Sequence, residues 1–245
     1  MDELDGVVGI LTGTRPSICD ELHAWLDTLP PPPAVERVRQ PGNQIAWQRN
    51  QVVKRMYEMD KPWVLFVDAD CVPPRGALEA LLATGRALIS GVVLERVEPF
   101  EVCAVRSFEP HERWTVADVV ARPEPFAVPS VGTGCLLVRR QVFDRVPAPW
   151  FRCGQVNPEV LSEDLDFCLR AAAAGFLPHL HPRVLVGHRT DVILWPGRDG
   201  DVLAQWSDAE GRVPARAPLS DTVRHRLIHA GCEWLHRQHT EAASP

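Results

Sequence analysis

The chain has 245 residues, of which 45% are hydrophobic and 24% charged, with a formal net charge of −6 and a pI near 5.8. This balance is typical of a globular protein with a buried core, and it gives no reason to expect a polyanionic partner. No apolar run approaches the roughly 20 residues that span a bilayer, and the acidic start "MDELDG" lacks the apolar core of a signal peptide.

The first part of the chain alternates short apolar runs with helical patterns. "GVVGIL" (6–11) predicts a buried strand, and the apolar stripe of residues 17–29 predicts a helix with Ser17 as its N-cap. The proline run that follows ends this helix. We then expect, in order, a strand over 34–39, a helix over 43–59, a strand over 63–67, a helix over 74–85 and a strand over 87–93. Such alternation predicts a mostly parallel sheet covered by helices, in which ligands bind beyond the carboxyl ends of the strands.

The second part of the chain is less regular at its start. Residues 95–131 contain short β-like pieces, "FEVCAV" and "RWTVADV", between breaks that contain proline. The later patterns predict a strand over 132–138, a short helix over 139–146, a helix from Ser162 to Gly175, a strand over 183–188 and a helix over 220–239. We expect residues 1–190 to form an α/β domain and residues 191–245 to be a C-terminal extension of it, a lid segment followed by a helix.

Two carboxylates follow the apolar strand "WVLFV". Asp68 and Asp70 are two residues apart, so in extended chain they point to the same side, and they stand where ligands bind to a parallel sheet. Oxygen ligands of this kind suit Mg²⁺ or Mn²⁺. An EF-hand loop counted from Asp68 is excluded, because its sixth position is Pro73, where that loop needs glycine. The alternative for both aspartates is that they only cap the helix that follows.

Five segments in chain order resemble glycosyltransferases of the GT-A fold, particularly those of family two. They are "WQRN", "LFVDADCVPP" with its D-x-D, "GTGCLLVRRQVF", "SEDLDFCLRAAAAGF" and the late "VGH". The resemblance covers roughly residues 6–188. It implies an α/β, GT-A (Rossmann-like) fold with a mostly parallel central sheet flanked by helices and a helical C-terminal extension.

The resemblance implies a metal site. It assigns Asp70 as a direct ligand, Asp68 to the donor ribose or to the metal through water, and His188 as the remaining protein ligand. The ion, Mn²⁺ or Mg²⁺, acts in such enzymes as a Lewis acid on the leaving diphosphate of a nucleotide-sugar. A mixed carboxylate and imidazole set favours Mn²⁺. The alternative for His188 is a strand-end histidine bonded to the backbone.

An inverting reaction also needs a general base for the acceptor hydroxyl. Glu163 and Asp164 are the candidates, with Asp164 as the base and Glu163 as a binder of the acceptor. The alternative is that acidic residues in a first helical turn only complement the helix dipole. Asp166 is expected to face solvent.

Residues nearer the N-terminus are assigned to the donor. Thr12, Gly13 and Arg15 lie in the loop after the first strand, where GT-A enzymes hold the nucleoside. Gly13 allows close approach of the backbone, and Arg15 offers charge to the diphosphate. The loop "TGTRPS" matches neither of the common glycine-rich phosphate-binding patterns.

Two alternative roles are possible for Arg49 and for the glycines Gly132 and Gly134. Helical spacing places Arg49 near the buried face, from which it reaches the donor or forms an ion pair, for example with Glu36 or Asp68. Gly132 and Gly134 let a sugar or an acceptor pass close to the backbone, or they mark a β-bulge.

The segment after "VGH", the last predicted helix and the cysteines are three further features of the sequence. Asp191, Trp195 and Arg198 follow "VGH", where this fold often carries a mobile lid over the donor. The last predicted helix holds one stripe of possible zinc ligands, but a single helix does not close a tetrahedral site, so we expect a polar or partner-facing stripe: His225, His229, Cys232, His236 and His239. The seven cysteines form no CxxC pair, which favours reduced, mostly buried thiols in a cytoplasmic protein.

The sequence therefore predicts a metal-dependent glycosyltransferase of the hexosyl- or N-acetylhexosaminyl-transfer class, which moves a sugar from a nucleotide-diphosphate sugar to an acceptor hydroxyl with inversion. The alternatives are a retaining GT-A enzyme, a nucleotidyltransferase and a non-catalytic nucleotide-sugar binder. "TGTRPS" is a poor version of the basic, glycine-rich loop of nucleotidyltransferases, and a binder has no use for a base. The acceptor stays open between a glycan, a small or lipid-linked metabolite, a protein side chain and a modified nucleobase.

Overall fold

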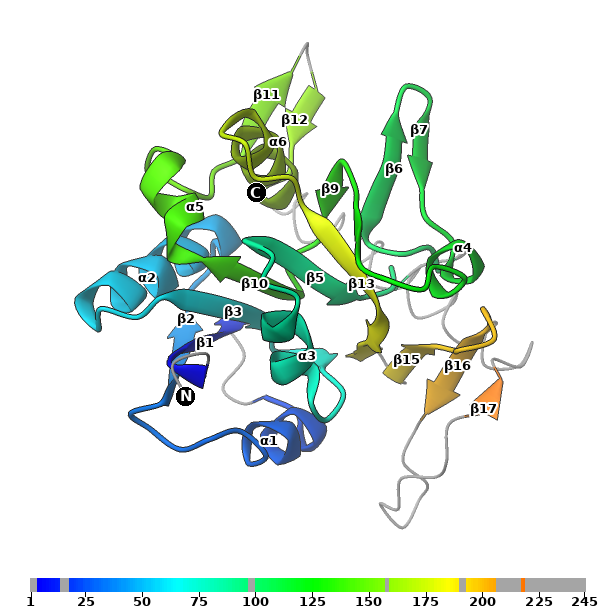
Figure 1. The fold of residues 1–245 in the computed structure, drawn as a ribbon, viewed down its shortest axis with the longest axis horizontal. Helices are drawn as coiled ribbons and strands as arrows, with labels where there is room; N and C mark the ends of the chain where they lie inside the picture. The colour runs from blue at the N-terminus through cyan, green and yellow to red at the C-terminus, as the bar shows by residue number, and fades with distance from the viewer. Residues whose placement is uncertain are drawn as a thin grey trace, which may run out of the picture.

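The computed structural model describes residues 4–13, 18–96, 100–156, 159–189, 193–205 and 217–218. Within these ranges a seven-stranded sheet forms the centre of the molecule (Figure 1). Its strands are, in spatial order, β2 (Val35–Pro41), β1 (Gly6–Gly13), β3 (Trp63–Asp68), β10 (Cys135–Arg139), β5 (Leu88–Val92), β13 (His179–Leu185) and β8 (Phe126–Ala127). The helices are α1 (Asp20–Leu26), α2 (Ile45–Glu58), α3 (Ala77–Ala83), α4 (Val116–Val120), α5 (Arg140–Arg145) and α6 (Glu163–Ala173).

The central sheet is mixed in direction. β1 pairs in parallel with β2 and β3, and β13 pairs in parallel with β5. In contrast, β10 is antiparallel to both of its neighbours, β3 and β5, and β8 is antiparallel to β13. The expected α/β class is confirmed, but the sheet is less parallel than expected, because the long excursion between β5 and β10 returns the chain in the opposite direction. The apolar run of β10 is buried on both sides and does not encode that direction.

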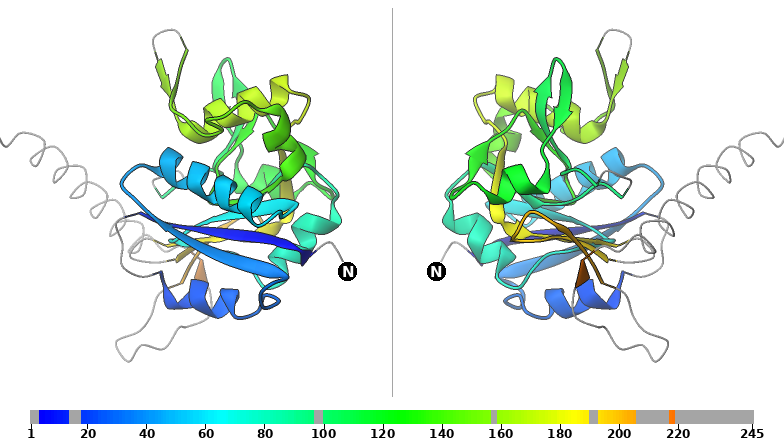
Figure 2. Two further views of the ribbon diagram at one scale, coloured as in Figure 1. Left: turned by 90° about the vertical axis from the view of Figure 1, so that its left-hand side faces the viewer. Right: turned by 90° about the vertical axis from the view of Figure 1, so that its right-hand side faces the viewer.

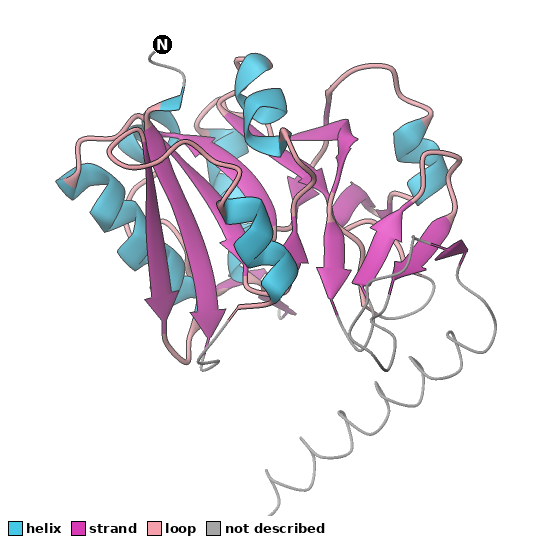
Figure 3. Cartoon of the chain, turned by 90° about the horizontal axis from the view of Figure 1, so that it is seen from below, coloured by secondary structure: helices cyan, strands magenta, loops and turns pink. Residues whose placement is uncertain are grey.

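Helices cover both faces of the sheet. Alternate residues of β3 point in opposite directions, with Val64 and Phe66 in one core cluster and Leu65 and Val67 in the other. The first cluster includes residues of α2, α5 and α6, and the second includes residues of α1 and α3. Figure 2 shows α1 and α2 on opposite sides of the strands, and Figure 3 shows the twisted sheet from below, with helices on both faces. The N-terminal half of the sequence therefore forms the layered structure expected from its pattern.

Three smaller sheets surround this core. β6 (Ala104–Phe108) pairs with β7 (His111–Arg113) and β9 (Ser130–Val131), and β11 (Gly154–Val156) pairs with β12 (Glu159–Leu161). The third sheet joins β4 (Cys71–Val72), β14 (Gly187–Arg189), β15 (Ile193–Pro196), β16 (Val202–Gln205) and β17 (Ala217–Pro218). In it, His188 is the direct antiparallel partner of Cys71. This pairing brings the late histidine beside the end of the D-x-D segment.

Two predictions about local structure are wrong. α1 begins at Asp20 with Cys19 at its N-cap, so Ser17, which lies outside the described residues, is not the cap. Part of "RWTVADV" forms helix α4 instead of a strand, because the Thr115 side chain accepts a hydrogen bond from the backbone N–H of Asp118 and caps it. Valines three residues apart then share one buried face, so a pattern that reads as a strand fits a short helix equally well.

Other boundaries shift by a few residues. β10 begins at Cys135, three residues later than expected, and the expected strand over 183–188 is divided at Val186 between β13 and β14. The predicted helix over 220–239, with its stripe of histidines and Cys232, lies outside the described residues. No helix in the described ranges is long and apolar enough to cross a membrane.

Candidate metal and donor site

His188 and Asp70 face each other at the edge where β4 meets β14. His188 Nε2 lies 3.8 Å from Asp70 Oδ1. Donor atoms of Asp70, Cys71 and His188 all lie within 4.8 Å of one another. The predicted pairing of the late histidine with the second aspartate of D-x-D therefore has a geometric basis.

The imidazole of His188 is oriented by the backbone. Its Nδ1 lies 2.6 Å from the carbonyl oxygen of Leu94. Because a carbonyl only accepts hydrogen bonds, Nδ1 carries a proton, and in the neutral imidazole the lone pair of Nε2 then lies on the side of Asp70. Metal-binding histidines are commonly oriented in this way, so the backbone bond and the ligand role, weighed above as alternatives, are compatible.

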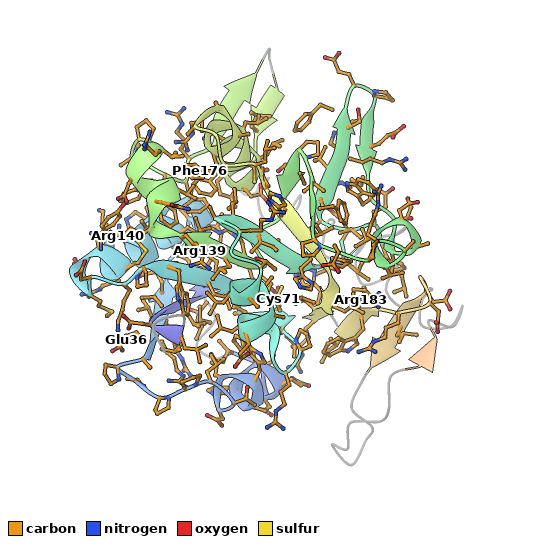
Figure 4. All side chains as sticks on the ribbon, viewed as in Figure 1. Glu36, Cys71, Arg139, Arg140, Phe176 and Arg183 are labelled. Carbon is orange, nitrogen blue, oxygen red and sulfur yellow. The ribbon has the colours of Figure 1, made fainter. Side chains whose placement is uncertain are left out.

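Cys71 belongs to the core more than to the site. Its side chain is fully buried, and it lies near the middle of Figure 4. Burial, together with the nearby carboxylates of Asp68 and Asp70, raises the pKa of this thiol well above its usual range. A methyl group at Gly134 would lie 2.9 Å from its sulfur, so the thiol packs against that glycine. The residues that fit a hard divalent cation are therefore the carboxylate and the imidazole.

The remaining cysteines are also free thiols in the part of the chain that the structure describes. Cys135 and Cys168 are buried, and burial raises their pKa values to about 12 and about 11. Cys153 is exposed, and Cys19 and Cys103 are half-buried. The prediction of mostly buried thiols thus holds for Cys71, Cys135 and Cys168.

Asp70 has a second charged neighbour. Arg96 Nη1 lies 3.0 Å from Asp70 Oδ2, and the Arg96 side chain is 47% exposed. The backbone carbonyl of Asp70 accepts a hydrogen bond from the N–H of Arg189. Sequence reasoning did not identify Arg96, because nothing in its local pattern distinguishes it from other surface arginines.

Arg49, on α2, links two carboxylates from different elements, one at the end of β3 and one at the start of α6. Its side chain is only 3% exposed; Nη2 lies 3.3 Å from Asp68 Oδ1, and Nη1 binds Glu163 Oε1. The ion pair with Asp68 was one of the expected alternatives, whereas the pair with Glu163 was missed. Burial raises the pKa of the Asp68 carboxyl, and the charge of Arg49 partly offsets this effect. Arg49 thus reaches the site from the buried face of α2, as its spacing indicated.

The two acidic residues that open α6 differ in their surroundings. Glu163 is occupied by its ion pair with Arg49. Asp164 Oδ1 accepts hydrogen bonds from the N–H of Leu165 and from the hydroxyl of Ser162, the N-cap. The other oxygen, Oδ2, lies 4.0 Å from the position that a Cβ at Gly132 would take. Of the two, Asp164 is the carboxylate not committed to an arginine among the described residues.

Several of these groups line one cavity of about 340 Å³, whereas Asp70 is not part of its wall. Its walls include Arg49, Asp68, Glu163, Asp164 and His188 from the predicted set. Polar residues that were not predicted complete the wall, from β9–β10 and from the β6–β7 side: Thr133, Glu95, His111 and Arg113. Residues of α2, β3, α6 and β14, which contain four of the segments that resemble GT-A glycosyltransferases, therefore line the same cavity.

Thr12 and Gly13, which were expected in the loop after the first strand, form the end of β1, and this end is held by α2. Thr12 is buried, and Gly13 has a positive φ of 61°, which favours glycine. The N–H of Gly13 donates to Gln48 Oε1 at 3.1 Å, and Gln48 Nε2 donates to the carbonyl of Gly42. Neither Thr12 nor Gly13 lines the cavity, and Arg15 lies outside the described residues. The sequence singled out Gly13 but not Gln48, whose side chain bonds the backbone of Gly13 and Gly42.

Asp166 does not face solvent, as was expected. It is 7% exposed, and its Oδ2 lies 2.7 Å from Arg170 Nε and 3.3 Å from Arg152 Nε. The segment around Trp150 and Phe151 covers this side of α6, which the helical pattern alone does not reveal. Asp166 is therefore a structural ion-pair residue.

The segment expected to form a lid is packed where it is described. Trp195 is 4% exposed in β15, and its ring lies where a side chain at Gly187 would be. Arg198 lies in an exposed turn, and Asp191 lies outside the described residues. The residues of β15 thus pair with β14 in the sheet that holds His188.

Fold and cavity together define an α/β protein with a mixed, helix-covered sheet and a polar site beyond the end of β3. No protein-family model matches the sequence, and a comparison with curated proteins finds no match. Among solved structures, the crystal structure of A197 from STIV is similar, with a TM-score of 0.59 and 18% sequence identity, covering 86% of this chain and 98% of that one. At this identity the likeness shows the fold alone.

Proposed function

We propose that the protein is a metal-dependent glycosyltransferase of GT-A fold that uses a nucleotide-diphosphate sugar as donor and an acceptor hydroxyl. The observation that carries the proposal is the orientation of His188: its Nδ1 lies against the carbonyl of Leu94, its Nε2 faces Asp70, and it lines a cavity whose wall also includes Asp68 and Asp164. A carboxylate and a backbone-fixed imidazole form a donor set for Mn²⁺ or Mg²⁺.

The proposed metal site consists of Asp70 and His188, and Asp68, which lies in the cavity wall, would act through the donor ribose or through water. A bound ion would supply Lewis-acid stabilisation of the leaving diphosphate. The protein's own contribution is to fix the ligands: Leu94 orients the imidazole, and the N–H of Arg189 holds the carbonyl of Asp70. Such supporting contacts limit the rearrangement that binding requires.

Asp164 is the general base in this proposal. Its Oδ1 is held by Ser162 and Leu165, so the carboxylate has a fixed direction into the cavity. Glu163, which we earlier assigned to the acceptor, is paired with Arg49, so its role is to hold that arginine in place. Transfer with inversion then needs the acceptor hydroxyl to give its proton to Asp164 as it attacks the sugar.

The metal site is tested by thermal unfolding with Mn²⁺, Mg²⁺ or EDTA. An ion at about 100 times its Kd stabilises the folded state by about 2.7 kcal/mol, which for a chain of this size is a rise in Tm of roughly 5–11 °C. Asp70→Asn and His188→Gln should abolish this rise, while His23→Gln, on α1, should retain it. Equal rises in all the variants would place the ion elsewhere and remove the basis of the proposal.

Catalysis is tested by donor hydrolysis and transfer with UDP-glucose, UDP-N-acetylglucosamine and GDP-mannose in the presence of Mn²⁺. Loss of a general base typically lowers turnover by about 10²–10⁴-fold, which we expect for Asp164→Asn with donor binding preserved. A loss of only a few-fold would favour the retaining alternative. If no nucleotide diphosphate alters the Tm with Mn²⁺ present, glycosyl transfer is the wrong reaction.

A further inference from the structure

Thr133 is a buried hydroxyl residue in the wall of the cavity. Its side chain is 2% exposed, and it lies between Gly132 and Gly134, which also line the cavity. Its Oγ1 has no hydrogen-bond partner among the described residues. Buried hydroxyls are nearly always paired, because an unpaired one loses its bonds to water without replacement. A binding partner from outside the chain would account for this residue.

The backbone around Thr133 is, in contrast, well hydrogen-bonded. The N–H of Gly132 donates to the carbonyl of Cys103 at 2.6 Å, and the carbonyl of Gly134 accepts from the N–H of Asp68 at 3.2 Å. The buried hydroxyl of Ser90 donates to the carbonyl of Cys135 at 3.0 Å. The turn is therefore held on several sides, whereas the side-chain hydroxyl of Thr133 has no partner in the part of the chain that the structure describes. A rigid turn that presents one unsatisfied polar group is suited to recognition.

Thr133 lies between the proposed metal site and the proposed general base. On one side, Gly134 is bonded to the backbone of Asp68, next to the metal ligand. On the other, Gly132 lies beside Asp164, the proposed base. In a displacement the transferred group stands between the leaving diphosphate and the incoming nucleophile. A residue placed between Asp68 and Asp164 therefore faces the transferred group.

A second unsatisfied atom supports a polar ligand in the same cavity. Arg49 Nε is buried without a hydrogen-bond partner among the described residues, although both terminal nitrogens of the guanidinium are paired. Arg49 and Thr133 both line the cavity. A donor N–H and a hydroxyl that both donates and accepts are complementary to sugar hydroxyls.

We propose that Thr133 is a specificity-determining residue that hydrogen-bonds a hydroxyl group of the transferred sugar. This inference rests on the proposed glycosyltransferase function and adds the residue that distinguishes the sugar from the nucleotide diphosphate. A site built to bond a hydroxyl discriminates against ligands that lack it, because its own polar group is then left unpaired.

The test compares a sugar nucleotide with its nucleotide diphosphate. Kd values are measured by calorimetry with Mn²⁺ for UDP-glucose and UDP, and for GDP-mannose and GDP, on the wild-type protein and on Thr133→Val and Thr133→Ser. Valine keeps the shape and removes the hydroxyl, whereas serine keeps the hydroxyl. For the pair that binds the wild type, we expect Thr133→Val to weaken the sugar nucleotide by about tenfold and to leave the nucleotide diphosphate unchanged, with serine within about threefold of wild type.

Unfolding of the ligand-free protein completes the test. Thr133→Val should be as stable as the wild type or more stable, because no hydrogen bond within the protein is lost. A destabilised ligand-free Thr133→Val would mean that the hydroxyl is bonded within the chain and would overturn the inference. Unchanged binding of the sugar nucleotide, or equal weakening of both ligands, would overturn it while leaving the glycosyltransferase proposal intact. If the wild type binds none of the four ligands, both proposals fail.

Discussion

Arg49→Met is expected to destabilise the protein by about 3 kcal/mol. Arg49 is buried and bonds two carboxylates, Glu163, which is 13% exposed, and Asp68, which is 30% exposed. Removing one partner of a buried ion pair typically costs about 3–5 kcal/mol, since the other charge is left without compensation. Part of Asp68 regains contact with water, which favours the lower end of this range. Methionine keeps much of the stem packing, but it loses the cation–π contact with Phe151.

Urea denaturation measures this free energy of unfolding, and the matching fall in Tm is about 6–12 °C for a chain of this size. Arg55→Met is the matched control, because Arg55 lies on the same helix and forms an exposed pair with Glu58 at 2.8 Å. Its loss should change the stability by less than about 0.5 kcal/mol. Adding Glu163→Gln to Arg49→Met should restore part of the stability, because the stranded charge is removed.

A loss below about 1 kcal/mol for Arg49→Met would refute the reasoning, since it would place the two carboxylates in contact with bulk water. A double variant less stable than Arg49→Met would also refute it, because the stranded charge of Glu163 would not then be the source of the cost.

Two further predictions concern the core beside the site and the far end of the sheet. Gly134→Ala should lower the free energy of unfolding by about 1–3 kcal/mol, because the new methyl group contacts the Cys71 sulfur. In a Cys71→Ala background the same change should cost much less. If denaturant unfolding shows that the two losses are additive, this explanation is wrong. Burial lowers the pKa values of His179 and His181 in the folded protein. Between these lowered values and the usual value, the unfolded chain binds more protons than the folded protein does. The free energy of unfolding therefore falls as the pH is lowered from about 7 to about 5. Urea unfolding of His179→Gln/His181→Gln at both pH values should show a smaller fall, and an equal fall would exclude these histidines as its source.

The layered fold could be predicted wherever a local pattern encodes the buried face. The strand that ends at Asp68 follows from a short, continuous apolar run, and the buried position of Arg49 on its helix follows from a period of 3.6 residues. The direction of β10 could not be predicted from the sequence, because a strand buried on both faces has the same apolar pattern in either direction. Helix α4 was missed for a related reason, since its few valines fit both a strand pattern and a helical one.

The contacts that complete the site were beyond sequence reasoning because they join distant segments. Arg49 and Glu163 are 114 positions apart, and Leu94 orients His188 across 94 positions. Asp166 was misjudged in the same way, since the segment that covers it is not part of its helix. Thr133 was not predicted, because the missing hydrogen-bond partner of its hydroxyl among the described residues can be seen only in the structure.

The pairing of Arg49 also changes how the site must bind a diphosphate. The sequence left Arg49 open between reaching the donor and forming an ion pair, and in the structure its charge is shared between Asp68 and Glu163. Releasing it toward a phosphate would strand both carboxylates in a partly buried wall that already contains Asp164. A diphosphate entering this wall needs positive charge from elsewhere, and in the proposed function a divalent ion at Asp70 and His188 would supply it without breaking the ion pairs of Arg49. Metal binding would then precede or accompany donor binding, and the terminal nitrogens of Arg49 would position the acidic residues rather than bind the diphosphate.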